Sequence, residues 1–312
     1  MATETLARPK AVRRPGDRIF SALSTASGIL ILTILAGVAA FLIWQAWPAL
    51  TAAPEDVRGG KGLVSYIGPL LFGTVVSATI ALLIATPLAV GIALFISHFA
   101  PRRLAVTLGY LVDLLAAVPS LVFGLWGIAV LAPATVPVMG WLNRYFGWLP
   151  FFNGPVTTTG RTIFVVGIVL AVMILPIMTA VNREVFLQAP RLHEEASLAL
   201  GATRWEMIRM AVLPFGRSGV ISGMMLGLGR ALGETMAVAI ILSGSARYTL
   251  DLISASNPGT IAGDIALQFP ESSGLDVNTL IASGLVLFAV TLVVNMAARW
   301  IVSRRAEFSG AN

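Results

Sequence analysis

The sequence has no cysteine and only two histidines, His98 and His193, among its 312 residues. Without cysteine, neither a disulfide nor a thiolate metal site can form, and two isolated histidines are too few for a histidine metal site. The phosphate-binding loop pattern Gly-x-x-x-x-Gly-Lys-Ser/Thr is also absent, so this chain cannot cradle ATP with such a loop. These absences exclude disulfide scaffolds, thiolate or histidine metal sites and P-loop nucleotide binding.

Charge is also scarce. Only 12% of the residues are charged, against about a quarter in an ordinary soluble domain, whereas 57% are hydrophobic. A soluble core could not hide that much apolar surface, so lipid must be the solvent for much of the chain. The net charge of +6 comes from short basic clusters between apolar runs. That placement is typical of membrane orientation and argues against a polyanion-binding role.

Six apolar segments reach the roughly 20 residues that a membrane-spanning helix needs. The sequence therefore predicts an all-α integral membrane protein with about six transmembrane helices. The first segment follows a basic cluster, as in a signal peptide, but it is too long for a cleaved signal and is interpreted as a span. An aromatic-rich stretch over 133–161 is predicted to lie at the bilayer interface without crossing. The predicted spans are 23–47, 67–96, 104–132, 162–182, 218–243 and 279–302.

The loops differ in their content of lysine and arginine, which predicts the orientation. With the N-terminus inside, fifteen of these residues fall on the cytoplasmic side and five on the outer side. Because cytoplasmic loops carry the excess of positive charge, both termini are predicted to face the cytoplasm. The predicted cytoplasmic parts are an N-terminal segment over 1–22, a loop over 183–217 and a tail over 303–312.

The loop over 183–217 is predicted to form a helix–turn–helix. Pro190 opens a first helix, Gly201 breaks it, and Thr203 caps a second helix with Glu206 at the capping-box spacing. Pro214 is expected to end the second helix before the next span. A plain alternative is a solvated loop that merely connects two spans.

The same loop carries a motif that resembles the EAA loop of ABC importer permeases. The spacings from Glu to Gly and from Gly to Leu-Pro both match, although Ser197 replaces an alanine and Ala211 replaces an isoleucine. The resemblance implies a coupling helix that docks on a separate ATP-binding subunit. The residues that carry it are Glu195, Ala196, Ser197, Gly201, Leu213 and Pro214.

The fifth predicted span combines glycines with charge. Gly219, Gly223 and Gly227 recur every four residues, the pattern that lets helices approach closely in lipid. On a continuous helix, Arg230 and Glu234 would share their face. A charge at the bilayer centre costs about 2.5–3.5 kcal/mol on insertion scales, so this face should meet protein or water.

Two interpretations of the charged pair stay open. In the first, Arg230 and Glu234 only neutralise each other and lock the helix into a bundle. In the second, they line a substrate path together with Thr235, with Arg230 attracting an oxyanion and Glu234 orienting its guanidinium. Asp113 in the third span either joins a polar network with Arg230 or reaches a cytoplasmic cavity, and a structural role is favoured for it.

Three further stretches resemble phosphate ABC transporter permeases, of which they are most similar to the PstC family. Residues 227–238 resemble the family signature, and residues 119–127 and 16–20 resemble other parts of it, so the similarity covers about 16–305. This implies a MetI-like type I permease in the bacterial inner membrane. It also implies a non-catalytic chain without a cofactor of its own, the ATP and Mg²⁺ being bound by an ATPase.

The resemblance implies partners as well: a second permease, PstA, two copies of the ATPase PstB, and the periplasmic phosphate-binding protein PstS. The alternative is a secondary transporter or channel that moves an anion with ion gradients. For that class we would expect paired interrupted helices in two matching halves, which the sequence does not indicate. A signalling role in phosphate sensing could coexist with import.

Overall fold

The computed structural model describes residues 15–245 and 247–306, with side chains up to residue 300. Over this part the chain is helical, and its only extended pairing is a single β-bridge between Ser245 and Pro258. Parts of the two predicted cytoplasmic ends, 1–14 and 307–312, lie outside the described residues.

Six helical stretches are long and apolar enough to cross a membrane, which confirms the predicted fold class. They are Pro15–Thr51, Leu63–Phe99, Ser120–Phe146, Ile163–Leu187, Arg204–Leu232 and Leu275–Trp300. The individual helices are α1 (Pro15–Thr51), α2 (Leu63–Leu94), α3 (Arg102–Ala116), α4 (Ser120–Trp126), α5 (Ala132–Phe146), α6 (Ile163–Leu187), α7 (Arg191–Ala199), α8 (Arg204–Met207), α9 (Leu213–Leu232), α10 (Met236–Ile241), α11 (Ile261–Gln268) and α12 (Leu275–Ala306).

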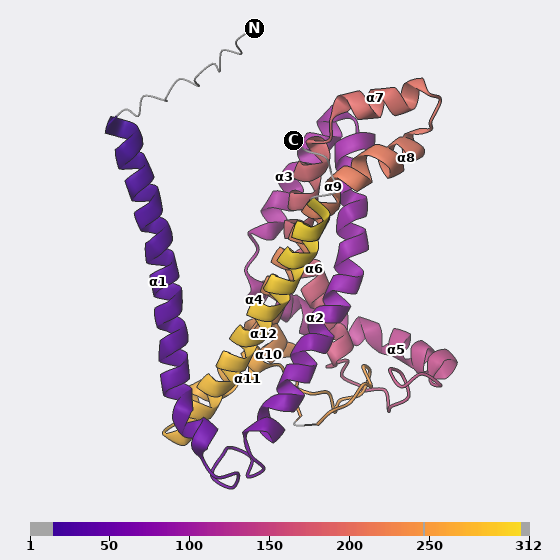
Figure 1. Cartoon of the computed structure of the whole chain (residues 1–312). Helices are drawn as coiled ribbons and strands as arrows, with labels where there is room; N and C mark the ends of the chain where they lie inside the picture. The colour runs from indigo at the N-terminus through magenta and orange to yellow at the C-terminus, as the bar shows by residue number, and fades with distance from the viewer. Residues whose placement is uncertain (1–14, 246, 307–312) are drawn as a thin grey trace.

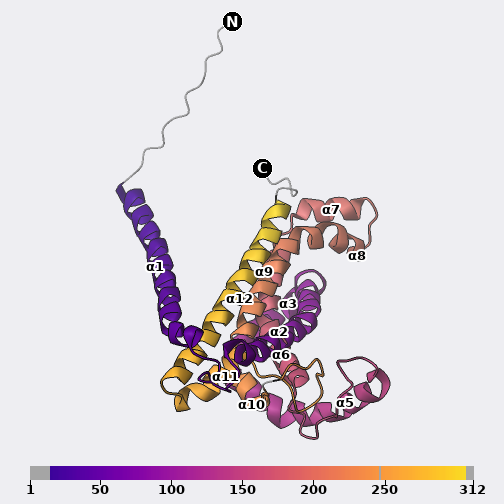
Figure 2. The ribbon, with the colours of Figure 1, turned by 60° about the horizontal axis from the view of Figure 1, so that its bottom comes forward.

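The predicted third span, 104–132, is not one helix. The chain leaves helical geometry between Ala116 and Ser120, where Pro119 has no N–H to donate and restricts Val118 to extended conformations. The apolar helix then continues through a π-helical turn at Gly127–Leu131 into α5. Half of the stretch predicted as interfacial is therefore helical, and Figures 1 and 2 show α5 extending sideways from the bundle.

The prediction that Pro214 ends the second loop helix is wrong. The helix runs on from Arg204 to Leu232, with a π-helical turn at Ile208–Val212 just before the proline. Pro214 directly follows this π-helical turn, where the regular hydrogen-bond pattern of the α-helix is already interrupted and a missing N–H costs less. The loop is thus connected rigidly to the fifth span.

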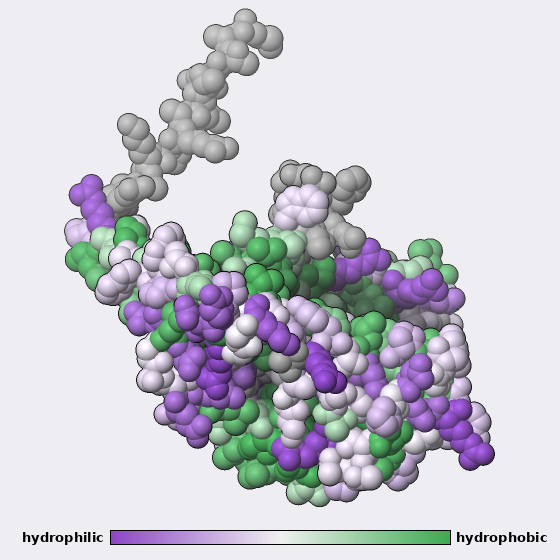
Figure 3. Space-filling model, turned by 90° about the horizontal axis from the view of Figure 1, so that it is seen from below, coloured by the Kyte–Doolittle hydropathy of each residue, from purple (hydrophilic) through white to green (hydrophobic). Residues whose placement is uncertain are grey.

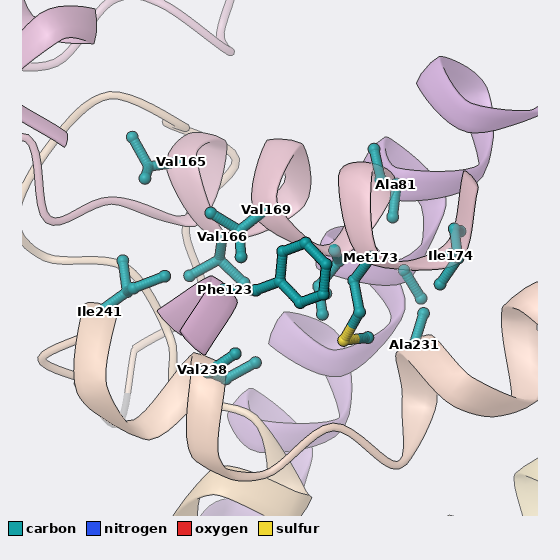
Figure 4. Close-up of a cluster of buried hydrophobic side chains, with 14 of the residues drawn as sticks. Ala81, Phe123, Val165, Val166, Val169, Met173, Ile174, Ala231, Val238 and Ile241 are labelled. Carbon is teal, nitrogen blue, oxygen red and sulfur yellow. The ribbon is translucent and has the colours of Figure 1, made fainter. Parts of the chain in front are cut away.

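The core forms around α6, which packs against α2 on one side and α9 on another. Alanines spaced three or four residues apart line the buried face of α2, which allows close approach to α6. Phe123 of α4 inserts between Val166 and Met173 of α6 and Val238 of α10 (Figure 4). The alanines of this face are Ala78, Ala81, Ala85, Ala89 and Ala93.

The helix α1 stands apart from this core (Figure 1). Residues 15–38 are all exposed, and α1 meets the other helices only toward its end, where Ala46 and Ala49 pack with residues of α2 and α12. Its exposed apolar surface therefore fits a lipid environment.

The two ends of the bundle differ. The start of α1, the end of α12 and the pair α7–α8 lie at one end, whereas α5 and α11 lie at the other (Figures 1 and 2). Figure 3 looks onto the second end, where hydrophilic side chains are spread over much of the surface between apolar ones. The loop that resembles the EAA motif therefore projects beyond the opposite end of the bundle.

Candidate functional site

The glycine face of α9 packs against α6. Gly219, Gly223 and Gly227 are buried. A Cβ atom at Gly219 would lie 2.5 Å from Val185 Cγ1, and one at Gly227 would lie 2.8 Å from Met178 Sδ. The glycines thus allow the two helix backbones to approach, and this face of the fifth span meets protein.

The fifth span is interrupted within the predicted segment 218–243. The helix α9 ends at Leu232, and α10 begins at Met236 after three residues that include Glu234 and Thr235. Glu234 is buried, and its Oε1 accepts a hydrogen bond of 3.0 Å from the backbone N–H of Ala237. The carboxylate therefore satisfies an unpaired amide at the start of α10.

The prediction that Arg230 and Glu234 are neighbours on one helix face is wrong. Arg230 lies in the last turn of α9, whereas Glu234 caps the next helix. No ion pair joins them among the residues that the structure describes. The Nε of Arg230 is buried and makes no hydrogen bond within the described chain, so this donor can serve another acceptor.

Asp113 does not join Arg230 either. Its Oδ2 lies 3.9 Å from Nη2 of Arg183, which ties α3 to the end of α6. The predicted network with Arg230 is therefore not formed, and the contact with Arg183 agrees with the structural role favoured for Asp113.

Arg161 holds the far end of α10 and was missed by the sequence analysis. Its Nε and Nη2 donate to the backbone oxygens of Ile241 and Ile240 at 3.1 and 3.2 Å. A guanidinium at the C-terminal end of a helix is favourable for its unpaired carbonyls. No local pattern signals this contact, because the partners are about 80 residues apart in sequence.

The short helix α10 is also held from the side. A Cβ at Gly124 of α4 would lie 2.8 Å from the Cα of Ala237, so the two backbones are in close contact. With Glu234 at its start and Arg161 at its end, α10 is a separate, positioned element beside the break.

We expect Arg161→Gln to loosen α10. The change removes two hydrogen bonds from a charged donor, each worth about 1.5–3 kcal/mol, and glutamine can replace only part of them. The melting temperature of the detergent-solubilised protein should fall by roughly 5 °C. Arg144→Gln on α5 is the matched control, since Arg144 is exposed. Equal melting temperatures for both variants would show that Arg161 does not hold α10.

The loop helices α7 and α8 are joined by a tight turn at Gly201, whose φ is +87°. The capping box predicted for Thr203 and Glu206 is confirmed: Thr203 N–H donates to Glu206 Oε2 at 2.7 Å, and Glu206 N–H donates to Thr203 Oγ1 at 3.3 Å. Glu195 and Ala196 are exposed, and Ser197 Oγ donates to the backbone oxygen of His193.

The same loop exposes apolar side chains. Leu200 beside the turn is 90% exposed, and Leu192 and Trp205 on the two helices are exposed as well. A loop that only had to be solvated would not need such residues, so this surface is suited to contact with another protein.

A small cavity of about 200 Å³ lies beside α10, between α2 and α11. Its polar side includes Tyr66, whose hydroxyl donates to Asp264 Oδ2 at 2.5 Å. Burial raises the pKa of Asp264, while the hydrogen bond from Tyr66 and the charge of Arg58 act in the opposite direction. These contacts tie α2 to α11 next to the interrupted span.

A known protein family and a solved structure are similar to this chain. A family model described as "Binding-protein-dependent transport system inner membrane component" matches residues 85–307. The fold is similar to that of a bacterial alginate ABC transporter in complex with an alginate pentasaccharide-bound periplasmic protein, with a TM-score of 0.61 and 18% identity over 92% of this chain and 95% of that one. The chain is therefore an inner-membrane, multi-pass permease component of an ABC importer.

Curated relatives show to which family of permeases the chain belongs. Phosphate transport system permease protein PstC 2 of Mycobacterium tuberculosis is 47% identical over 98% of this chain and all of the relative. PstC of Mycobacterium leprae is also 47% identical, over 95% and 96% of the two chains, and PstC of Mesorhizobium japonicum is 36% identical over 95% and 92%. The chain belongs to the PstC family of phosphate transport system permeases, which confirms the resemblance found in its sequence.

Proposed function

We propose that this chain forms part of the path for inorganic phosphate in an ATP-driven importer. The observation that carries the proposal is the interrupted fifth span, in which a partly buried arginine lies in the last turn of a helix packed on glycines. The identity of 47% to PstC proteins supports phosphate as the substrate.

The residues at the break suit an oxyanion. Arg230 offers a planar fork of donors that matches a tetrahedral oxyanion, and its Nε is not used within the described chain. Glu234 fixes the start of α10, and Thr235 stands beside it with a hydroxyl group. We assign Arg230 to substrate attraction, and Glu234 and Thr235 to the shape of the path around it.

The loop 183–217 supplies the coupling. Its exposed apolar residues and the EAA-like residues Glu195, Ala196, Ser197 and Gly201 are assigned to docking on the ATPase. Because Leu213 and Pro214 lie in one continuous helix from Arg204 to Leu232, a push on the loop would reach the break directly. ATP hydrolysis and the binding of Mg²⁺ are assigned to the partner ATPase, and this chain is proposed to be non-catalytic.

The proposed complex contains PstA as second permease, two PstB subunits and the periplasmic PstS. The excess of lysine and arginine supports an orientation with both termini and the loop 183–217 in the cytoplasm. The exposed α7–α8 pair would then face the ATPase, and the end with α5 and α11 would face PstS.

Reconstitution in liposomes tests the function. The complete complex should accumulate radiolabelled phosphate only with ATP, and vesicles that lack the ATPase should not. A secondary transporter would accumulate phosphate without the ATPase when an ion gradient is applied, and that result would overturn the proposal.

A bulky residue at Gly201 should uncouple ATP hydrolysis from transport. Its φ of +87° suits glycine, and a β-branched side chain there would be strained by about 1–2 kcal/mol. We expect Gly201→Val to keep ATP hydrolysis but to lower the phosphate taken up per ATP. Gly274→Val is the matched control, because Gly274 also has a positive φ and open space but lies at the other end of the bundle. Equal ratios in both variants would contradict the role of the turn.

A further inference from the structure

The contact between His98 and Glu194 joins the loop to the bundle. His98 lies in the π-helical turn Phe95–Phe99 that continues α2, and Glu194 lies in the first turn of α7. The His98 Nε2 and Glu194 Oε1 atoms are 3.6 Å apart, and the two side chains are 9% and 21% exposed. The pair is therefore largely shielded from water, which limits screening by salt.

The histidine ring is held from its other side. Ser97 Oγ lies 2.7 Å from His98 Nδ1 and also 2.8 Å from the backbone oxygen of Ala93. A hydroxyl group has one proton, and when it donates to Ala93 its oxygen accepts from Nδ1–H. The ring is thus oriented so that Nε2 faces the carboxylate of Glu194, where a protonated nitrogen is attracted to it.

The helix α7 itself makes few other contacts that could hold it against the bundle. No residue of α7 is buried, so apolar packing contributes little to its position. Among the described residues, the contact with His98 is the one close pairing of a basic and an acidic side chain between α7 and the bundle, and it is an ion pair when the histidine is protonated. At the other end of the link, Ala93 and Leu94 of α2 lie in one buried cluster with Phe186 of α6. The same cluster includes Ala189, Met207 and Ile208 of the loop, so the segments on either side of α7 pack on α2, whereas α7 itself contributes no residue to the cluster.

We propose that His98 is a positioning residue that transmits movement of the coupling loop to α2, as a second route beside the continuous helix from Arg204 to Leu232. The proposal rests on the proposed function, since it assumes that α7 docks on an ATPase. It adds a route that the EAA-like motif does not contain, because His98 and Glu194 lie outside that motif. The interrupted span and α2 would then respond to the same loop through different contacts.

A charge swap in the reconstituted complex tests the link. His98→Glu places two carboxylates opposite each other, and we expect the phosphate taken up per ATP to fall at least about fivefold. The double variant His98→Glu with Glu194→His restores the opposite charges and should recover to within about twofold of the wild type. Arg102→Glu is the control: it places a new carboxylate on an exposed residue at the start of α3, outside the two loop helices, and should leave the ratio unchanged.

Two milder variants keep the test decisive if His98→Glu does not assemble. His98→Gln and Glu194→Gln remove the ion pair without repulsion and should each lower the ratio. A wild-type ratio in these variants, or a double swap that assembles but stays uncoupled, would overturn the proposal. ATP-driven phosphate uptake by the wild-type complex is scored separately, so its absence would count against the proposed function and not against the link.

Discussion

We expect phosphate uptake to be lost in the Arg230→Gln complex, while the complex itself should assemble at the wild-type level. The guanidinium lies at the end of α9, and its Nε has no hydrogen-bond partner in the described chain. Removing it therefore breaks no hydrogen bond of Nε within this chain, and assembly should be unaffected. A hydrogen bond to a charged group is worth about 1.5–3 kcal/mol, and a bidentate contact loses two of them. Uptake of radiolabelled phosphate should fall at least about a hundredfold.

Two comparisons separate this effect from a general loss of charge. Arg230→Lys keeps the charge but not the planar fork, so uptake should be intermediate. Arg217→Gln changes an exposed arginine near the other end of α9 and should leave uptake unchanged. Normal uptake by Arg230→Gln would remove Arg230 from the mechanism.

Gly219→Leu should prevent formation of the complex. A Cβ at this position would already lie 2.5 Å from Val185 Cγ1, and valine cannot easily turn away because it is stiff at χ1. Overpacking costs about 1–3 kcal/mol in a well-packed core, and a leucine that separates two helices should reach the upper part of that range. The yield of monodisperse complex in size-exclusion chromatography should fall to a small fraction of the wild type.

Gly229→Leu provides the control on the same helix. Nothing lies within 4 Å of a Cβ built at Gly229, and leucine favours a helix more than glycine does. This variant should be recovered in the normal amount. If Gly219→Leu were recovered equally well, α6 and α9 could not be packed as described.

The number of spans and the all-α class could be predicted because hydropathy over about 20 residues is a local property. The capping box of Thr203 and Glu206 and the turn at Gly201 were also predictable, since each depends on neighbours in the sequence. The break in the third span was not predicted. Pro119 was present in the sequence, but the apolar composition continues across it and only the backbone geometry separates α3 from α4.

The candidate site was predicted in part. The glycine pattern correctly placed one face of α9 against protein. The spacing of Arg230 and Glu234 is compatible with a continuous helix, and nothing local decides against it. The break depends on the Glu234 cap and on distant contacts of α10 with Gly124 and Arg161, which no periodicity records.

The isolation of α1 has a mechanical consequence. Residues 15–38 are all exposed, and at 1.5 Å per residue the helix extends about 46 Å from Pro15 to its packed residue Ala46. A rotation of about 10° near Ala46 would carry Pro15 through roughly 8 Å. The position of the first turns of α1 must therefore be determined by the bilayer and neighbouring subunits more than by the rest of this chain.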